Sequence, residues 1–357
     1  MLFDKFQTMA DFQAELEERQ VRPFGAVTTE ILSSTEGIVE GRRVILAGTN
    51  NYMGLSYHPR CIKAAQEAAE RWGTGTTGSR LANGSFAEHQ ALEDEIADFY
   101  GVSNAIVFST GYAATMGMCA TLAGPGDVIL LDADSHASIY SGVKLSGAEI
   151  IRFKHSNPDD LAKRMRRLGD RAGQALIVAE GIYSMLGDVA PLQEIAEVKR
   201  EYGGYLLVDE AHSMGVLGES GRGAAQAAGI ESEVDFIVGT FSKSLGSIGG
   251  FCVSPHKELE AIRFCITSYI FTASSSPSII ASTREALRII GEEPERREQL
   301  WDNASRLYQG LKSLGLAVGP TASPVVAVEM EDRSQTVDCW KALLEKGVYV
   351  NLVIPPA

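Results

Sequence analysis

Short apolar runs alternate with amphipathic helical patterns through the middle of this chain. The apolar runs predict strands at Ala105–Phe108, Val128–Leu131, Glu149–Phe153, Leu176–Ala179, Tyr205–Val208, Phe236–Val238 and Gly250–Val253. Helical periodicity covers intervening stretches such as Glu88–Tyr100, Asp159–Leu168 and Pro191–Glu201. Apolar strands separated by helices are typical of an α/β fold, with a mostly parallel central sheet that helices cover on both faces.

The pattern changes toward both ends of the chain, and it predicts three parts. Residues 1–45 are predicted to form an N-terminal amphipathic helix and arm, because acidic residues lie among the apolar positions of MLFDKFQTMADFQAELEERQ. Residues 46–275 are predicted to form a large domain. Residues 276–357 are predicted to form a smaller C-terminal α+β domain, since a long charged helical pattern at 291–315 is followed by shorter strand-like pieces.

Charge and cysteine content narrow the classes of partner. A formal net charge of −14 argues against a nucleic-acid partner and disfavours electrostatic docking on anionic lipid. The sequence shows neither a signal-peptide core nor an apolar run of membrane-spanning length, although a peripheral membrane contact stays open. Five cysteines without a CxxC pair indicate reduced thiols in a cytoplasmic protein, and no metal site is indicated.

Polar residues with catalytic potential follow the predicted strands. Gly111, His136, Glu180, Asp209 and Lys243 each come just after one of these strands. Because ligands bind outside the carboxyl ends of the strands in open α/β sheets, we expect these residues to share one site.

A lysine and a carboxylate in this arrangement predict a site for pyridoxal 5′-phosphate (PLP). Lys243 lies in GTFSKSLGSIGG (239–250), and its amine is nucleophilic only if burial or nearby positive charge lowers its pKa. Asp209, in YLLVDEAHSMG (205–215), would keep the pyridine nitrogen of the cofactor protonated. The lysine would attach the cofactor covalently through an imine.

The phosphate of such a cofactor also has candidate ligands. Gly111 and Tyr112 follow a predicted strand in VFSTGYAA (107–114) and are expected to open a helix, whose N-terminal amides favour a phosphate. Thr240 and Ser242 add hydroxyl donors. Each signal is weak alone, and their joint occurrence in this order makes the prediction strong.

At the level of whole motifs, the chain resembles the α-oxoamine synthases, which are fold-type I PLP enzymes that condense an amino acid with an acyl thioester and release CO₂. The resemblance runs from TNNYMGL (49–55) to the end of the chain. It includes GTGTTGSRLANGSFAEHQALE (73–93), DADSHASIYSG (132–142), EGIYSMLGD (180–188), VDEAHSMGVLG (208–218) and YIFTASSSPS (269–278). The details SMLGD, DADSHASIY, FSTGY and YIFTAS are most similar to the branch that condenses L-serine with a long-chain acyl-CoA.

The resemblance implies an aminotransferase-like fold, PLP as cofactor, and a role for each matching residue. Lys243 would carry the cofactor, Asp209 would pair with its pyridine nitrogen, and His136 would stack on its ring and contact the amino-acid carboxylate. The other implied contacts are His212 with the phenolic oxygen, Ser184 nearby, Gly111, Tyr112 and Thr240 with the phosphate, and Asn51 near the substrate. Thr272 would reach the phosphate from the second subunit of a homodimer with shared active sites.

Two alternatives remain open at this stage. The chain could use glycine or alanine with a shorter acyl group, as in 2-amino-3-ketobutyrate CoA ligase, aminolevulinate synthase or 8-amino-7-oxononanoate synthase. It could also be a non-catalytic PLP-binding partner subunit, although the presence of both Lys243 and Asp209 speaks against that. In the family, the sequence PPA that closes this chain is followed by a segment with a carboxylate-binding arginine. We therefore expect further residues beyond Ala357, and the alternative is a protein that does without that arginine.

Overall fold

The computed structural model describes residues 2–354, and their contacts divide into two compact units. The larger unit comprises Asn50–Val328, and the smaller unit combines the N-terminal segment up to Thr49 with the C-terminal segment from Glu329. The sequence PPA at residues 355–357, after which further residues are expected, lies outside the described residues.

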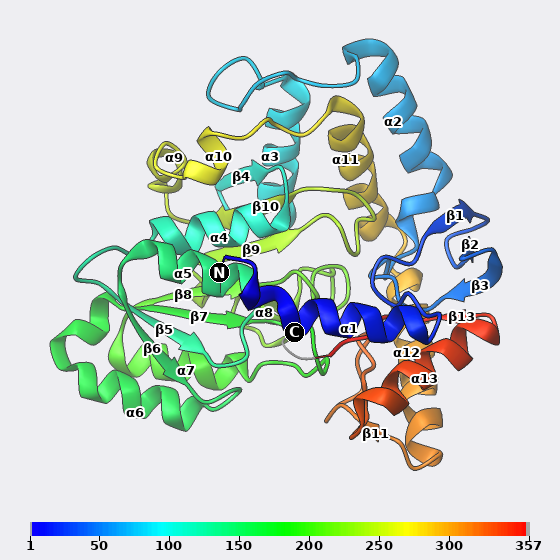
Figure 1. The fold of residues 1–357 in the computed structure, drawn as a ribbon. Helices are drawn as coiled ribbons and strands as arrows, with labels where there is room; N and C mark the ends of the chain where they lie inside the picture. Colours follow the sequence, from blue (N-terminus) through cyan, green and yellow to red (C-terminus); the bar gives the residue numbers. More distant parts are fainter. Residues whose placement is uncertain (1, 355–357) are drawn as a thin grey trace. The chain divides into compact units, whose positions relative to one another are not determined.

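The larger unit is built on a seven-stranded sheet with the order β4-β10-β9-β8-β7-β5-β6 (Figure 1). The strands are β4 (Asn104–Phe108), β5 (Val128–Asp132), β6 (Glu149–Phe153), β7 (Leu176–Glu180), β8 (Tyr205–Asp209), β9 (Phe236–Thr240) and β10 (Gly250–Ser254). Neighbouring strands from β9 to β6 are parallel, whereas β10 runs antiparallel to both β9 and β4. All seven predicted strands and the mostly parallel sheet are therefore confirmed.

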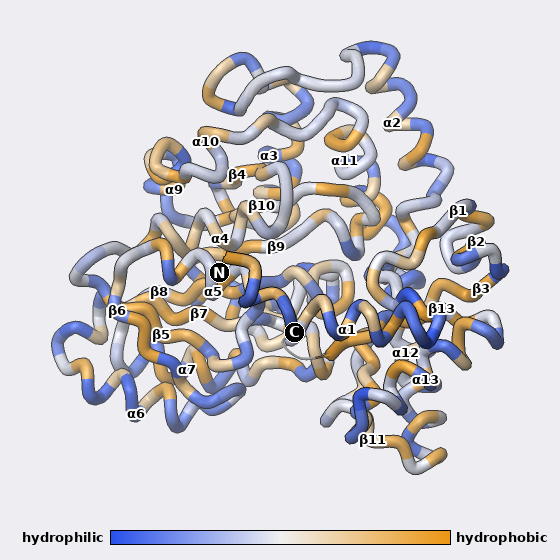
Figure 2. Tube along the Cα trace, in the orientation of Figure 1, coloured by the Kyte–Doolittle hydropathy of each residue, from blue (hydrophilic) through white to orange (hydrophobic). Residues whose placement is uncertain are grey.

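Helices cover both faces of this sheet because its strands are apolar on both faces. In β5, Val128 and Leu130 pack into one core cluster, while Ile129 and Leu131 pack into the other. The first cluster includes residues of α3 (Ala87–Tyr100), α6 (Pro158–Leu168), α7 (Leu192–Tyr202) and α11 (Pro277–Glu292). The second includes residues of α4 (Gly111–Thr121) and α5 (Ala137–Ser146). Figure 2 shows the hydrophobic colour concentrated along the central strands and hydrophilic stretches on the outer helix α6.

The helices of the larger unit include the three predicted ones. Their bounds are α2 (Pro59–Trp72), α3 (Ala87–Tyr100), α4 (Gly111–Thr121), α5 (Ala137–Ser146), α6 (Pro158–Leu168), α7 (Leu192–Tyr202), α8 (Ala224–Ala227), α9 (Leu259–Ile262), α10 (Thr267–Ile270), α11 (Pro277–Glu292) and α12 (Glu295–Ser313). Short 3₁₀ helices occur at η2 (Leu55–Tyr57), η3 (Gly169–Gln174) and η4 (Glu231–Glu233). The strands β11 (Ala317–Val318) and β12 (Val328–Glu329) follow α12 in the chain.

The smaller unit joins the two chain ends through a four-stranded sheet, β1-β2-β3-β13. Its elements are η1 (Asp4–Phe6), α1 (Gln7–Glu18), β1 (Thr28–Ile31), β2 (Glu36–Val39), β3 (Arg42–Leu46), α13 (Arg333–Glu345) and β13 (Val348–Tyr349). The helix α1 confirms the predicted N-terminal amphipathic helix, since Phe12 and Leu16 are buried in a core with Val44 and Trp340.

This division differs from the predicted boundary at 275/276. Helix α11 was expected to open the small C-terminal domain, but Ile280 and Leu287 on its apolar face belong to the main core of the larger unit, and α11 packs against α2 and α3. The sequence shows that α11 is amphipathic without showing which surface its apolar face will meet.

Candidate active site

A cavity of about 370 Å³ lies at the carboxyl ends of the central parallel strands. Nine of the predicted site residues line it, and they are Gly111, Tyr112, His136, Glu180, Asp209, His212, Thr240, Ser242 and Lys243. They lie at the ends of β7, β8 and β9 or in the segments that follow β4, β5, β8 and β9. The structure therefore brings together residues that are up to 132 positions apart in the sequence (Gly111 and Lys243).

Lys243 follows β9 and is suited to act as a nucleophile. Burial lowers the pKa of the Lys243 amine, although the negative charges of Asp209 and Glu180 raise it in part. A lowered pKa increases the fraction of neutral amine, which is the form that attacks a carbonyl carbon.

Asp209 ends β8 and is held by two hydrogen bonds. Thr115 Oγ1 donates to Oδ2 at 3.0 Å, and the backbone N–H of Ala211 donates to Oδ1 at 2.9 Å. The side chain is only 5% exposed, so both bonds fix its orientation toward the cavity that it lines. The sequence analysis missed Thr115, whose only signal was a hydroxyl on the otherwise apolar helix α4.

His136 precedes α5 and is fixed by contacts on both its ring and its backbone. Its Nδ1 lies 2.7 Å from Ser138 Oγ, and its backbone N–H donates to Glu180 Oε1 at 2.5 Å. Burial lowers the pKa of His136, an effect that Asp209 opposes and Lys243 reinforces, so the ring is neutral near pH 7. Burial and the charge of Asp209 raise the pKa of Glu180 well above its usual range, which favours its neutral acid form.

The first turn of α4, where a phosphate site is predicted, lies at the cavity. Thr110 Oγ1 accepts a hydrogen bond from the N–H of Ala113 at 3.0 Å, and the preceding amides, Gly111 and Tyr112, belong to residues that line the cavity. A Cβ on Gly111 would lie 2.5 Å from Thr240 Cβ, so only glycine allows this approach. Thr240 Oγ1 and Ser242 Oγ lie 2.8 Å apart at the same end of the cavity.

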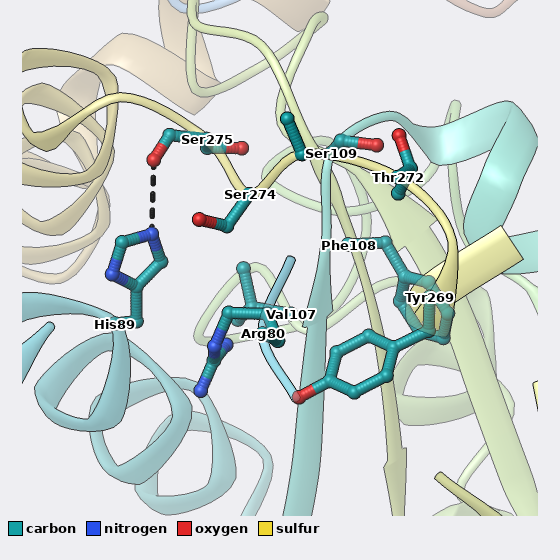
Figure 3. A pocket seen from close by; sticks show the side chains of 10 residues that line it. Arg80, His89, Val107, Phe108, Ser109, Tyr269, Thr272, Ser274 and Ser275 are labelled. Carbon is teal, nitrogen blue, oxygen red and sulfur yellow. Dashed lines mark hydrogen bonds between the residues drawn. The ribbon is translucent and has the colours of Figure 1, made fainter. Parts of the chain in front are cut away.

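Three predicted site residues do not line this cavity. Asn51 Nδ2 donates to Ser56 Oγ at 2.7 Å, and Ser184 is half-buried in the loop after β7. Thr272 lines a separate small cavity with Arg80, Tyr269 and neighbouring serines (Figure 3). Its predicted role involves a second subunit, so the roles of these three residues stay predictions.

His89 lies beside the same small cavity and has a structural role. Its Nδ1 accepts from the backbone N–H of Phe86 at 3.2 Å at the start of α3. Its Nε2 contacts the carbonyl oxygen of Ser275 at 2.9 Å (Figure 3). His89 therefore joins α3 to the segment that carries Thr272.

The residues of the main cavity fit PLP. Lys243 offers an amine for the aldehyde of PLP, and Asp209 offers a carboxylate for its pyridine nitrogen. The first turn of α4, together with Thr240, offers hydrogen-bond donors for its phosphate. The close approach at Gly111 leaves the backbone of α4 open where a side chain would fill the cradle.

Known proteins are similar to this chain in sequence. The profile of the aminotransferase class I and II family matches residues 42–356. The serine palmitoyltransferase of Caulobacter vibrioides is 57% identical over 356 residues, covering 100% of this chain and 88% of that protein. The serine palmitoyltransferase of Sphingomonas paucimobilis is 48% identical, with coverage of 100% and 85%.

Solved structures agree with these matches. A serine palmitoyltransferase structure with PLP as an internal aldimine has a TM-score of 0.96 and 47% identity to this chain, covering 100% of this chain and 90% of that chain. An 8-amino-7-oxononanoate synthase from Francisella tularensis has a TM-score of 0.75 and 26% identity, with coverage of 86% and 87%. The aminotransferase-like fold is thereby confirmed. The chain belongs to the aminotransferase class I and II family and, within it, to the group that contains the bacterial serine palmitoyltransferases.

Proposed function

We propose that this chain is a PLP-dependent acyltransferase that condenses L-serine with palmitoyl-CoA, with loss of CO₂, to give 3-ketodihydrosphingosine. The observation that carries the proposal is the convergence of Lys243, Asp209, His136 and the first turn of α4 on one cavity. The choice of serine and palmitoyl groups is supported by the relatives at 57% and 48% identity.

Each residue of the cavity has its own role in the proposed reaction. PLP, when bound, supplies an electron sink for negative charge at the α-carbon of the amino acid. Lys243 would hold the cofactor, and its Nζ would take the α-proton of serine. Asp209 would hold the proton of the pyridine nitrogen. His136 would stack on the cofactor ring and orient the serine carboxylate, a role that its place in the cavity lining supports.

Three further contacts belong to the same proposal. His212 would donate to the phenolic oxygen of the cofactor with Ser184 nearby, and Asn51 would contact the substrate. Thr272 would reach the phosphate of a second copy in a homodimer with shared sites. The strongly exposed Phe271 next to Thr272, with 82% of its surface accessible, supports an interface at this segment.

We also propose a cytoplasmic location. Between residues 2 and 354, none of the helices has both the length and the apolar character needed to cross a membrane. The cysteines at positions 61, 119, 252, 265 and 339 are all free thiols, which is consistent with a reducing compartment.

The test is substrate competition with product identification. The purified, PLP-loaded protein is incubated with serine, glycine or alanine and acyl-CoAs of graded length, and products are identified by mass spectrometry. We expect serine with palmitoyl-CoA to give the highest turnover, because a pocket that hydrogen-bonds a hydroxyl rejects analogues that lack it. Higher turnover with alanine or glycine and a shorter acyl group would favour an 8-amino-7-oxononanoate synthase or a related activity instead.

Matched lysine variants separate catalysis from general damage. Lys243→Ala should abolish product formation while the protein remains folded. Lys63→Ala is the control, since Lys63 is largely exposed and pairs with the equally exposed Glu67 on the same face of α2 at 3.6 Å. Full activity in Lys243→Ala would refute the proposed function.

A further inference from the structure

A half-buried tyrosine, Tyr52, contacts one ring nitrogen of His212. Tyr52 Oη is 2.7 Å from His212 Nδ1, and the two ring centroids are 6.2 Å apart. Tyr52 comes from TNNYMGL, 160 positions before His212, so the contact is a product of the fold. Among residues 2–354, no hydrogen-bond partner is found for His212 Nε2, and His212 lines the main cavity.

The protonation of both groups decides the direction of this hydrogen bond. Burial raises the pKa of the Tyr52 hydroxyl well above its usual value, so the hydroxyl keeps its proton. Burial, together with smaller contributions from Lys243 and His136, lowers the pKa of His212 to about 2. His212 is therefore a neutral imidazole at pH 7, with one nitrogen that donates and one that accepts.

The alternative arrangement has poorer geometry. If His212 Nδ1 carried the proton, the Tyr52 hydroxyl would have to donate elsewhere, and its other neighbour is Asn50 Oδ1 at 3.4 Å. A hydroxyl prefers an acceptor near 2.7 to 2.8 Å, so the Tyr52 hydroxyl donates its hydrogen bond to His212 Nδ1, which is the nearer acceptor. The hydrogen bond at one ring nitrogen sets the tautomer and so leaves the proton on the other.

We infer that Tyr52 is a positioning residue that fixes His212 in its Nε2–H tautomer, so that the imidazole presents an N–H donor to the cavity. The ligand atom for this donor is the phenolic oxygen of PLP, and this part of the inference rests on the proposed function. The opposite tautomer would turn a nitrogen lone pair toward that oxygen. Tyr52 thus acts through His212 and does not need to touch the cofactor.

The direct test is nuclear magnetic resonance of the full-length protein with ¹⁵N-labelled histidine. Correlation of ring nitrogens with ring protons distinguishes the two neutral tautomers, and the His212 signals are identified by their loss in His212→Asn. We expect wild-type His212 to be neutral with the proton on Nε2, both without and with PLP. Tyr52→Phe should lose this preference, since Nδ1 no longer has its donor.

A second measurement follows the consequence for the cofactor. The dissociation constant of PLP should rise about tenfold in Tyr52→Phe, because a charge-assisted hydrogen bond to the cofactor is weakened. Tyr100→Phe is the matched control: Tyr100 is buried, and its hydroxyl has no hydrogen-bond partner among the described residues. The control should leave both the His212 tautomer and the PLP affinity unchanged.

The outcomes distinguish this inference from the proposed function. An Nδ1–H tautomer or a protonated ring in the wild-type protein would overturn the inference, as would an unchanged tautomer in Tyr52→Phe. The tautomer is read without substrate and without turnover, so a protein with the expected tautomer that fails to condense serine would contradict only the proposed function.

Discussion

Glu93 on α3 is the buried centre of an ion-pair cluster, and its replacement by glutamine tests how much that cluster stabilises the fold. Its Oε1 and Oε2 accept from Arg80 Nη1 and Nη2 at 2.8 and 3.1 Å. Oε1 also accepts from the backbone N–H of Val107 at 2.9 Å, and Arg263 Nη1 lies 3.4 Å from Oε2. Glu93 is 2% exposed and Arg80 is 8% exposed, so water cannot solvate the Arg80 charge when the Glu93 charge is removed.

Glu93→Gln keeps the shape of the side chain and removes its charge. Breaking a buried ion pair from one side destabilises a protein by about 3–5 kcal/mol, because the remaining charge stays buried. Arg263 retains Glu260 at 2.7 Å and the carbonyl oxygen of Ala105 at 3.0 Å, so most of the loss falls on Arg80, which retains Ser85 Oγ. We therefore expect a loss of about 3 kcal/mol, which corresponds to a fall in Tm of about 4 °C for a chain of 357 residues, because the entropy of unfolding is about 2.1 cal/mol/K per residue.

The assay is thermal unfolding of the full chain followed by circular dichroism. Glu149→Gln is the control, because Glu149 pairs with Arg171 at 2.6 Å while both side chains are about half exposed. Such an exposed pair contributes at most about 1 kcal/mol. If Glu93→Gln lowered Tm no more than Glu149→Gln does, the reasoning from burial would be refuted.

Four shorter predictions concern the site and its surroundings. Lys243→Ala should eliminate the borohydride-reducible link to PLP, and a link at another lysine would show that the nucleophile was misassigned. Asp209→Asn should slow removal of the α-proton by at least about 100-fold, a barrier increase of roughly 2.7 kcal/mol, and unchanged kinetics would make Asp209 structural. Glu180→Gln should keep kcat/KM within about fivefold, because the raised pKa of Glu180 makes it a neutral acid that glutamine mimics; a much larger loss would indicate an ionised Glu180. Burial alone would lower the pKa of His155, but Asp132 and Asp188 raise it overall. The contribution of protonated His155 to stability is therefore full below about pH 6.5 and is lost as the pH rises through the raised pKa. His155→Gln should destabilise the protein more at pH 6 than at pH 9 in urea unfolding, and equal losses at the two pH values would contradict this.

The sequence predicts the sheet and the centre of the site because both depend on local patterns. Apolar runs identify the strands, and the residue that follows each strand must lie at the same edge of a parallel sheet, which brings Asp209 and Lys243 together. Glycine at 111 and a following helix indicate the phosphate cradle without knowledge of any tertiary contact.

Contacts between distant segments could not be predicted in this way. Thr115 reaches Asp209 across 94 positions, and Tyr52 reaches His212 across 160. The local sequence around each of these residues does not indicate its partner, because a hydroxyl on an apolar helix face and a tyrosine in a loop each have many possible acceptors. The same limitation explains the shifted unit boundary, where the apolar face of α11 gave no indication of the core that it joins.

The two carboxyl groups of the cavity differ in their hydrogen bonds, and this difference accounts for their separate roles. Asp209 accepts from both Thr115 Oγ1 and the N–H of Ala211, and donors of this kind stabilise a carboxylate. Among residues 2–354, the Glu180 carboxyl accepts only from the backbone N–H of His136, and burial together with the charge of Asp209 raises its pKa. Two buried negative charges beside one another are costly, and this cost favours the protonated form of Glu180. In the proposed function, Asp209 would hold the proton of the pyridine nitrogen, while Glu180 fixes the backbone of His136 without adding a second charge to the cavity.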